Sequence, residues 1–217
     1  MKRIKYELDG VKVPSLNNIL DNCKIGGIGN LLYRANQSGL AGRSLQSKEI
    51  DTTNAGLCAL QHIKSILNQD PLDLDVFSDN CIDRSNPCIN EFMDWKVSRE
   101  LQISTKDLTL VSEQLKFGDT FNTYTIYETE TCLIDIVMQN EVYPENLIKL
   151  AAMEHLLDIN GIPFGGRGFI IRINNPKDAE DHVLFNLHEY EELIYPRLVL
   201  ERMIKIYYDQ LTLKTLV

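Results

Sequence analysis

Hydrophobic and polar positions divide the chain into a helical first half and a strand-rich second half. The stretch "TTNAGLCALQHIKSILNQD" places apolar residues close to the 3.6-residue period of a helix, at Leu57, Leu60, Ile63, Ile66 and Leu67. A second helix is predicted over "CINEFMDWKVSRELQI", after an acidic, loop-rich stretch "PLDLDVFSDNCIDRSNP". Before these helices, "YEL" and "VKV" flank a DG turn and predict two short strands. A helix capped by Ser15 and another helix in "IGGIGNLLYRANQSG" follow them.

From about residue 108 the pattern changes to short β-rich runs separated by turns. "LTLVSEQLKF", "FNTYTIYET" and "TCLIDIVM" predict three strands, and "PENLIKLAAMEHLLDIN" predicts a helix that ends before Gly161. "GFIIRI" and "DHVLFNL" predict two more strands, and a last helix is expected from near His188 to about Gln210. This order predicts an α/β fold with a mixed sheet. We expect a single domain over 1–217, with a mainly helical part at 1–107 and a β-rich core with two helices at 108–217.

Composition and charge narrow the environment and the partners. The chain contains no run of about 18 apolar residues, and no apolar stretch follows its basic start, so neither a membrane span nor a secretory signal is expected. Five scattered cysteines favour reduced thiols and a cytoplasmic location. The 31 acidic residues outnumber 22 basic ones, and the net charge of −9 disfavours non-specific binding to duplex DNA. A local basic groove stays open at this point.

The clearest candidate for chemistry is Asp135, a charged residue inside the apolar run "LIDIVM". A carboxylate on such a strand, followed by a helix with small residues, is typical of a Mg²⁺ site. A basic residue usually stands two positions after the acid, and here that position is Val137. The same stretch therefore suggests both a metal-dependent enzyme and the loss of its activity.

Two longer stretches resemble one nuclease superfamily. "YELDGVKVPSLNNIL" and "ENLIKLAAMEHLLDINGIPFGGRGFIIRI" are similar to segments of RecB-type and lambda-exonuclease-like PD-(D/E)XK nucleases, and the likeness is spread over roughly residues 4–208. The resemblance implies a PD-(D/E)XK-like core, a mixed sheet flanked by helices, with a helical N-terminal region. It also implies cleavage of DNA with Mg²⁺ or Mn²⁺. There the metal lowers the pKa of its bound water, and a lysine stabilises the developing charge.

Matched position by position, the resemblance implies that most of the active-site residues are replaced. Glu113 and Asp135 remain as acids of the family pattern. The other matched positions carry Leu57 for threonine, Leu60 for histidine, Asn122 for aspartate, Val137 for lysine, Lys149 for glutamine and Met153 for tyrosine. The main hypothesis is therefore a catalytically inactive nuclease-like protein. In it Asp135 and Lys149 form a semi-buried ion pair left from the ancestral site.

Such a protein would be reused for protein binding or assembly. An origin in a phage or another mobile element is an expectation from the resemblance alone, and the location would then be the host cytoplasm or the virion. No cofactor is expected, and a protein partner is favoured over nucleic acid. The acidic segment 70–83 is one candidate contact, and a second copy of the chain is another possible partner.

The alternative hypothesis is an active metal-dependent DNA exonuclease. Lys149 would then supply the migrated lysine beside the catalytic acids Glu113 and Asp135. Asp119 would replace the acid missing at Asn122, so that Asp119, Asp135 and Glu113 would bind Mg²⁺ or Mn²⁺. An unrelated α/β domain is the third possibility.

Overall fold

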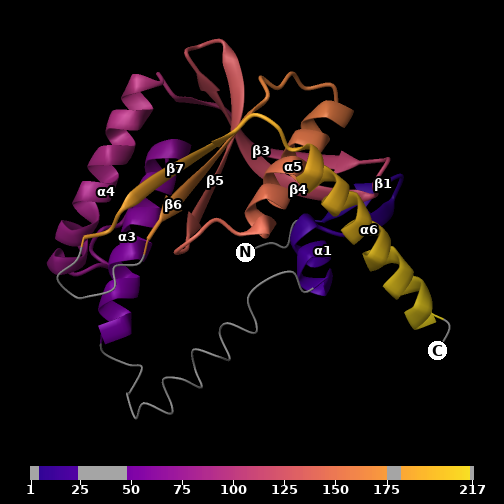
Figure 1. The fold of residues 1–217 in the computed structure, drawn as a ribbon, viewed down its shortest axis with the longest axis horizontal. Coiled ribbons are helices and arrows are strands. Elements are labelled where there is room, and N and C mark those ends of the chain that lie inside the picture. The colour runs from indigo at the N-terminus through magenta and orange to yellow at the C-terminus, as the bar shows by residue number, and fades with distance from the viewer. Residues whose placement is uncertain (1–4, 24–47, 175–181, 216–217) are drawn as a thin grey trace.

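A mixed β-sheet lies at the centre of the protein, with helices on both of its faces (Figure 1). The computed structural model describes residues 5–23, 48–174 and 182–215, and for 48–54 only the backbone. The predicted α/β class with a mixed sheet is confirmed. Among the described helices, none has the length and apolar character needed to span a bilayer.

The N-terminal elements agree with the prediction. Strands β1 (Tyr6–Leu8) and β2 (Val11–Val13) form an antiparallel hairpin. Helix α1 (Leu16–Cys23) follows, and Ser15 Oγ accepts a hydrogen bond from the Asn18 backbone N–H at 3.2 Å. Ser15 is thus the helix cap, as its side-chain chemistry predicts. The helix predicted around "NLLYRANQSG" lies outside the described residues.

Two long helices follow, and the second begins earlier than expected. Helix α3 (Lys48–Asn68) confirms the periodic pattern. Helix α4 (Asp79–Ser98) includes part of the stretch that was predicted as loop, and Pro87 lies inside it. That prediction was wrong beyond Ser78, which caps the helix by accepting from the Cys81 N–H. Burial of Cys81, Cys88 and Phe92 on one side of α4 outweighs the helix-breaking tendency of the proline.

The sheet has the order β3-β4-β5-β6-β7, and β5 and β6 are its one parallel pair among the described strands. The helix between them is α5 (Pro144–Ile159), which ends as predicted before Gly161, a residue with φ of +68°. The strands are β3 (Gln102–Ser112), β4 (Phe117–Ile126), β5 (Glu130–Met138), β6 (Arg167–Ile173) and β7 (Phe185–Tyr190).

The C-terminal boundary differs from the prediction. His188 was expected to begin the last helix, but it lies in β7 opposite Ile170 of β6. Helix α6 (Ile194–Thr215) starts six residues later. Pairing with the apolar strand β6 holds this polar segment in an extended conformation, and its own sequence does not indicate that partner.

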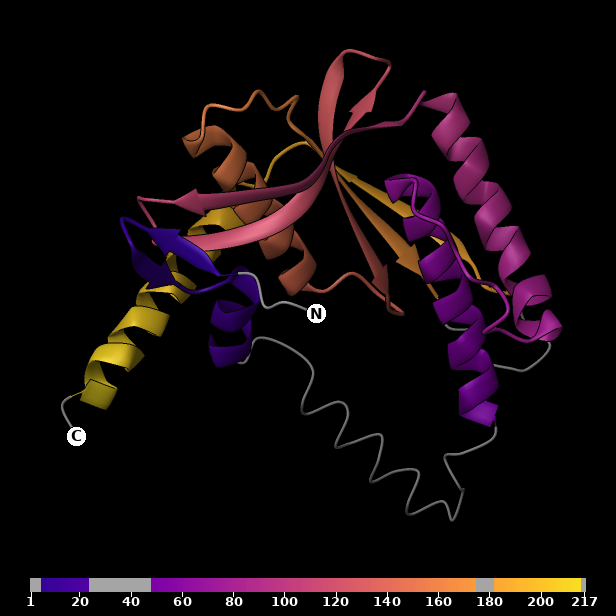
Figure 2. The same ribbon diagram turned by 180° about the vertical axis from the view of Figure 1, so that it is seen from behind.

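Each face of the sheet has its own hydrophobic core. Helices α1, α5 and α6 cover one face, where Phe117, Leu133 and Val137 are buried. Helices α3 and α4 cover the other, around Phe92 and Phe169. The two sets of helices lie on opposite sides of the sheet in both ribbon views (Figure 2).

Strands β4 and β5 pair over only a short part of their length. Residues 124–126 of β4 pair with residues 130–132 of β5. Beyond this ladder the β3–β4 hairpin turns away from β5, β6 and β7, which opens a fork in the sheet (Figure 2). The fork separates two strands that carry sequence-predicted site residues, Asp119 and Asn122 on β4 and Asp135 on β5.

Candidate functional site

The fork between β4 and β5 contains a pocket of about 310 Å³. Its lining combines polar and apolar residues from α3, both strands and α5: Lys64, Asn68, Thr120, Phe121, Asn122, Tyr124, Ile134, Asp135, Ile136 and Met153. The structure thus brings Asn122, Asp135 and Met153 to one place, although 31 positions separate the first from the last along the chain (153 − 122).

Asp135 is the acid at the centre of this fork. Its neighbours Leu133 and Val137 belong to the core under α5, so the alternation of the strand directs Asp135 to the same face. Burial raises its pKa, while Lys149, the amide of Asn146 and Lys64 lower it. Its Oδ2 atom is buried and has no partner at hydrogen-bond distance. A buried carboxylate oxygen without a hydrogen-bond partner lowers the stability of the folded protein, unless a bound group supplies the missing partner.

Lys149 lies close enough to influence both acids of the fork, but it forms its ion pair elsewhere. Its Nζ atom is 3.3 Å from Glu145 Oε1, one turn earlier on α5. Among the described residues, Lys149 forms its ion pair with Glu145 and none with Asp135, so the predicted ion pair between Asp135 and Lys149 is wrong. The physical reason is the i,i+4 spacing on the helix, which offers Lys149 a half-exposed carboxylate at a smaller desolvation cost.

Asp119 is the second acid that the fold places beside Asp135 and Lys149. Burial, with a smaller contribution from Asp135, raises the pKa of Asp119 to about 6, against the lowering effects of the Thr120 N–H and Lys149. The Thr120 N–H donates to Asp119 Oδ1 at 2.9 Å. Asp119 also lines a neighbouring pocket of about 420 Å³ with Lys5 and Lys12.

Glu113 is not part of this site. It is exposed in the turn after Ser112, the last residue of β3, and it lines a different pocket with Glu7 and Asn160. The sequence match places Glu113 on a strand, but the strand ends one residue before it. In the described part of the chain, no group of three or more His, Cys, Asp and Glu side chains is arranged to hold a metal. Two acids with lysines beside them are a poor donor set for Mg²⁺.

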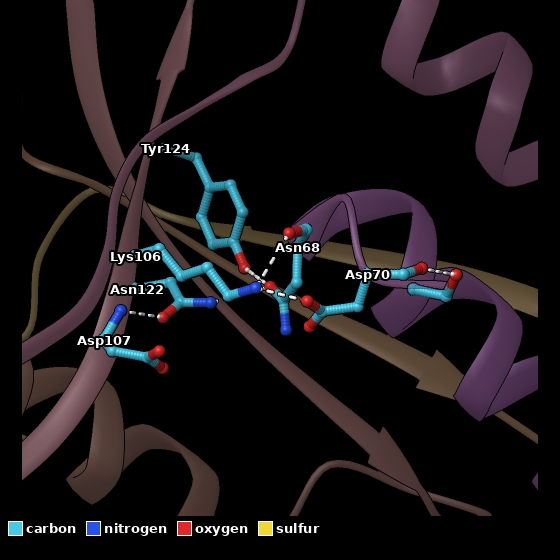
Figure 3. A network of polar contacts seen from close by, with 7 residues as sticks. Asn68, Asp70, Lys106, Asp107, Asn122 and Tyr124 are labelled. Carbon is cyan, nitrogen blue, oxygen red and sulfur yellow. Dashed lines mark hydrogen bonds and ion pairs between the residues drawn. The ribbon is translucent and has the colours of Figure 1, made fainter. Parts of the chain in front are cut away.

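Asn122 takes part in a hydrogen-bond network that ties β4 to the end of α3 (Figure 3). Its Nδ2 donates to Asn68 Oδ1 at 2.6 Å, and its Oδ1 accepts from the Asp107 N–H at 2.8 Å. The hydroxyl of Tyr124 donates to the same Asn68 oxygen at 3.1 Å. The one oxygen of Asn122 that could bind a metal is therefore already bonded to the backbone.

The same network extends to the edge of the sheet. Lys106 donates to the Asn68 carbonyl at 3.3 Å and forms an ion pair with Asp70 (Figure 3). The network is made of amide groups, the Tyr124 hydroxyl and one exposed ion pair, so it can be complete without a metal. Its evident effect is to hold the C-terminal end of α3 against β3 and β4.

Two of the other replaced positions, Val137 and Leu60, carry apolar side chains that pack in the two cores. Val137 is buried in the core under α5, and Leu60 packs half-buried against the core under α3 and α4. The apolar residues therefore fill the positions where the resembled chemistry uses lysine and histidine.

The sequence patterns missed a buried cluster around His155. Its Nε2 is 2.8 Å from Ser112 Oγ, and Arg197 donates to its Nδ1 at 3.2 Å. Because arginine only donates, Nδ1 must lack a proton, and Nε2–H must donate to Ser112. In this tautomer His155 cannot accept the serine proton, so the pair fastens α5 to β3 and α6 and does not form a nucleophile. No local spacing in the sequence connects these three residues.

Neither a scan against models of known protein families nor a search of curated proteins finds a match to this chain.

Proposed function

We propose that this chain is a PD-(D/E)XK nuclease-like protein that has lost metal-dependent DNA cleavage and acts by binding protein. The observation that carries the proposal is the hydrogen bonding of the Asn122 side chain. Both its amide nitrogen and its oxygen are used in hydrogen bonds within the fold. At the position where the resembled nucleases need a metal-binding aspartate, this chain has a structural amide.

The electrostatics of the fork support the same proposal. Lys149 and Lys64 both lower the pKa of Asp135, so positive charge already stands near the acid that would bind a cation. The position of the catalytic lysine is Val137, buried in the core. A metal would need at least one further acidic ligand, and the exposed Glu113 lies at another pocket.

The charge distribution favours a protein partner over DNA. The net charge of −9 opposes approach of a phosphate backbone. In the acidic segment 70–83, the side chains of Asp73, Asp75, Asp79 and Asp83 are exposed, while Asp70 is held by Lys106. We therefore propose a basic surface on another protein as the partner of this segment.

A cleavage assay tests the proposal. Purified protein is incubated with end-labelled linear duplex, single-stranded and 3′-overhang DNA, in Mg²⁺ and in Mn²⁺. We expect no cleavage and no band shift at about 0.15 M salt. Metal-dependent cleavage that disappears in Asp135→Ala, but persists in the exposed helix control Asp94→Asn, would show that the site is active.

An active exonuclease is the second candidate, and one observation favours it. Asp135 raises the pKa of Asp119, and Lys149 lowers the pKa of both acids. These are the three groups that a migrated-lysine site would use. If cleavage is found, its loss in Lys149→Ala but not in Lys205→Ala, an exposed lysine of α6, would establish this candidate.

A further inference from the structure

Helix α6 has apolar residues on two opposite faces. Its inner face buries Leu200, Met203 and Ile204 against the core under α5. Of the 14 large hydrophobic residues that are exposed in the described part of the chain, seven belong to α6: Ile194, Tyr195, Leu198, Val199, Ile206, Leu211 and Leu213. Such a concentration of exposed apolar side chains on one helix is typical of an interaction surface.

Six residues form what we term the outer stripe of α6: Tyr195, Leu198, Arg202, Ile206, Asp209 and Leu213. At 3.6 residues per turn they fall within an arc of roughly 80°, on the side opposite the buried residues. All six are exposed, and Tyr195 is exposed to 81%. The stripe is about 27 Å long at a rise of about 1.5 Å per residue. Helix α6 lies on the outside of the protein, and its C-terminal half extends past α1 (Figure 1).

We propose that the outer stripe binds the outer stripe of a second copy of this chain, with the two α6 helices antiparallel. A two-fold axis near residues 205 and 206 brings Leu198 of each copy opposite Leu213 of the other copy. The same register sets Arg202 of each copy opposite Asp209 of the other copy, so the charge pair occurs twice. The two Ile206 side chains meet beside the axis. Each contact is thus made in duplicate, as a two-fold interface requires.

Charge complementarity singles out this arrangement. In the antiparallel register both charged residues of the stripe face an opposite charge. In a parallel, in-register pair, Arg202 would face Arg202 and Asp209 would face Asp209, and both contacts would be repulsive. The exposed ion pairs select the register more than they add affinity. The leucine and isoleucine contacts supply the hydrophobic gain, so a dimer of micromolar affinity is expected.

Sedimentation velocity tests the dimer on the full chain, from about 1 to about 200 µM. The wild type should shift from monomer to dimer within this range. Leu198→Glu should weaken association at least about tenfold. Val97→Glu changes an equally apolar residue, exposed to 70% on α4, and should leave association unchanged. Circular dichroism of each variant shows whether it is folded, so loss of the dimer cannot be confused with loss of structure.

The charge pair gives a sharper test of the register. Arg202→Asp and Asp209→Arg should each weaken the dimer, because each places like charges opposite one another twice. The double variant exchanges the two charges and should restore association. A wild type that stays monomeric throughout the range would overturn the proposal. A dimer that tolerates Leu198→Glu, or a double variant no better than the single ones, would also overturn it. The inference does not depend on the nuclease resemblance, since none of these residues lies at the fork.

Discussion

Replacing Asp119 with asparagine should stabilise the protein at neutral pH. Burial raises the pKa of Asp119 from an ordinary 3.8 to about 6, which means that the folded protein disfavours the charged form. A shift of about 2 pKa units corresponds to about 3 kcal/mol at a pH where the carboxyl is ionised. Asparagine has nearly the same shape, and its oxygen can still accept the hydrogen bond from Thr120. It removes the charge and with it most of this cost.

The gain should depend on pH in a defined way. The folded-state pKa lies above the unfolded value, so the contribution of Asp119 to stability is fully present below about 3.8 and is lost as the pH rises through about 6. The variant lacks this titration. Its advantage over the wild type should therefore be near zero at about pH 4, grow between about pH 4 and pH 6, and be complete above about pH 7.

Urea unfolding at a series of pH values measures this difference. The free energy of unfolding of Asp119→Asn should exceed that of the wild type by up to about 3 kcal/mol at neutral pH, equivalent to roughly 6–12 °C in Tm for a chain of this size. Asp94→Asn, an exposed change on α4, should give no comparable gain. A variant that is no more stable than the wild type, or whose advantage is the same at every pH, would refute the reasoning.

Three further changes test contacts that hold neighbouring elements of the fold together. His155→Leu removes two hydrogen bonds and should cost about 2 kcal/mol. Burial and Arg197 lower the pKa of His155 below its ordinary 6.5. In thermal unfolding, the loss of stability of the variant relative to the wild type should therefore be largest above pH 6.5 and should shrink below it. A loss of stability that is the same at every pH would contradict this. Gly118→Ala places a Cβ atom 2.5 Å from the Tyr6 ring and should cost about 1–3 kcal/mol of stability. The clash should also release the β1–β2 hairpin, and its amide hydrogens should then exchange faster. Unchanged amide exchange in the hairpin would contradict this. Asn68→Ala leaves Asn122 without its acceptor and should cost about 1–3 kcal/mol in urea unfolding; an unchanged midpoint would show that the network is not structural.

Most elements of the fold could be predicted from the sequence because they follow local periodicity. The apolar period of α3, the Ser15 cap and the alternation of β4 and β5 are all short-range signals. The start of α4 at Asp79 and the strand at His188 could not be predicted in this way. Both depend on packing against partners that are distant in sequence, α3 for the first and β6 for the second.

The candidate site was less predictable than the fold. The resemblance predicts that Asp119, Asp135 and Lys149 lie close together. It does not predict that the Lys149 side chain turns along α5 and forms its ion pair with Glu145. Glu113 was expected at the site because the resemblance matches it to an acid on a strand, but β3 ends one residue before it. The sequence does not predict the fork itself. The fork begins where the three-residue ladder between β4 and β5 ends, and the residue pattern of the two strands does not indicate where their pairing stops.

Mn²⁺ binding is the most direct measurement of the central claim, that the fork no longer supports metal-dependent chemistry. Titration of the purified protein, followed by the electron paramagnetic resonance signal of free Mn²⁺, counts bound ions without any assumption about substrate. The account predicts no stoichiometric site, and the same free-ion signal for the wild type and for Asp135→Asn. One or two Mn²⁺ ions bound per chain, lost in Asp135→Asn and retained in the exposed control Asp94→Asn, would contradict it.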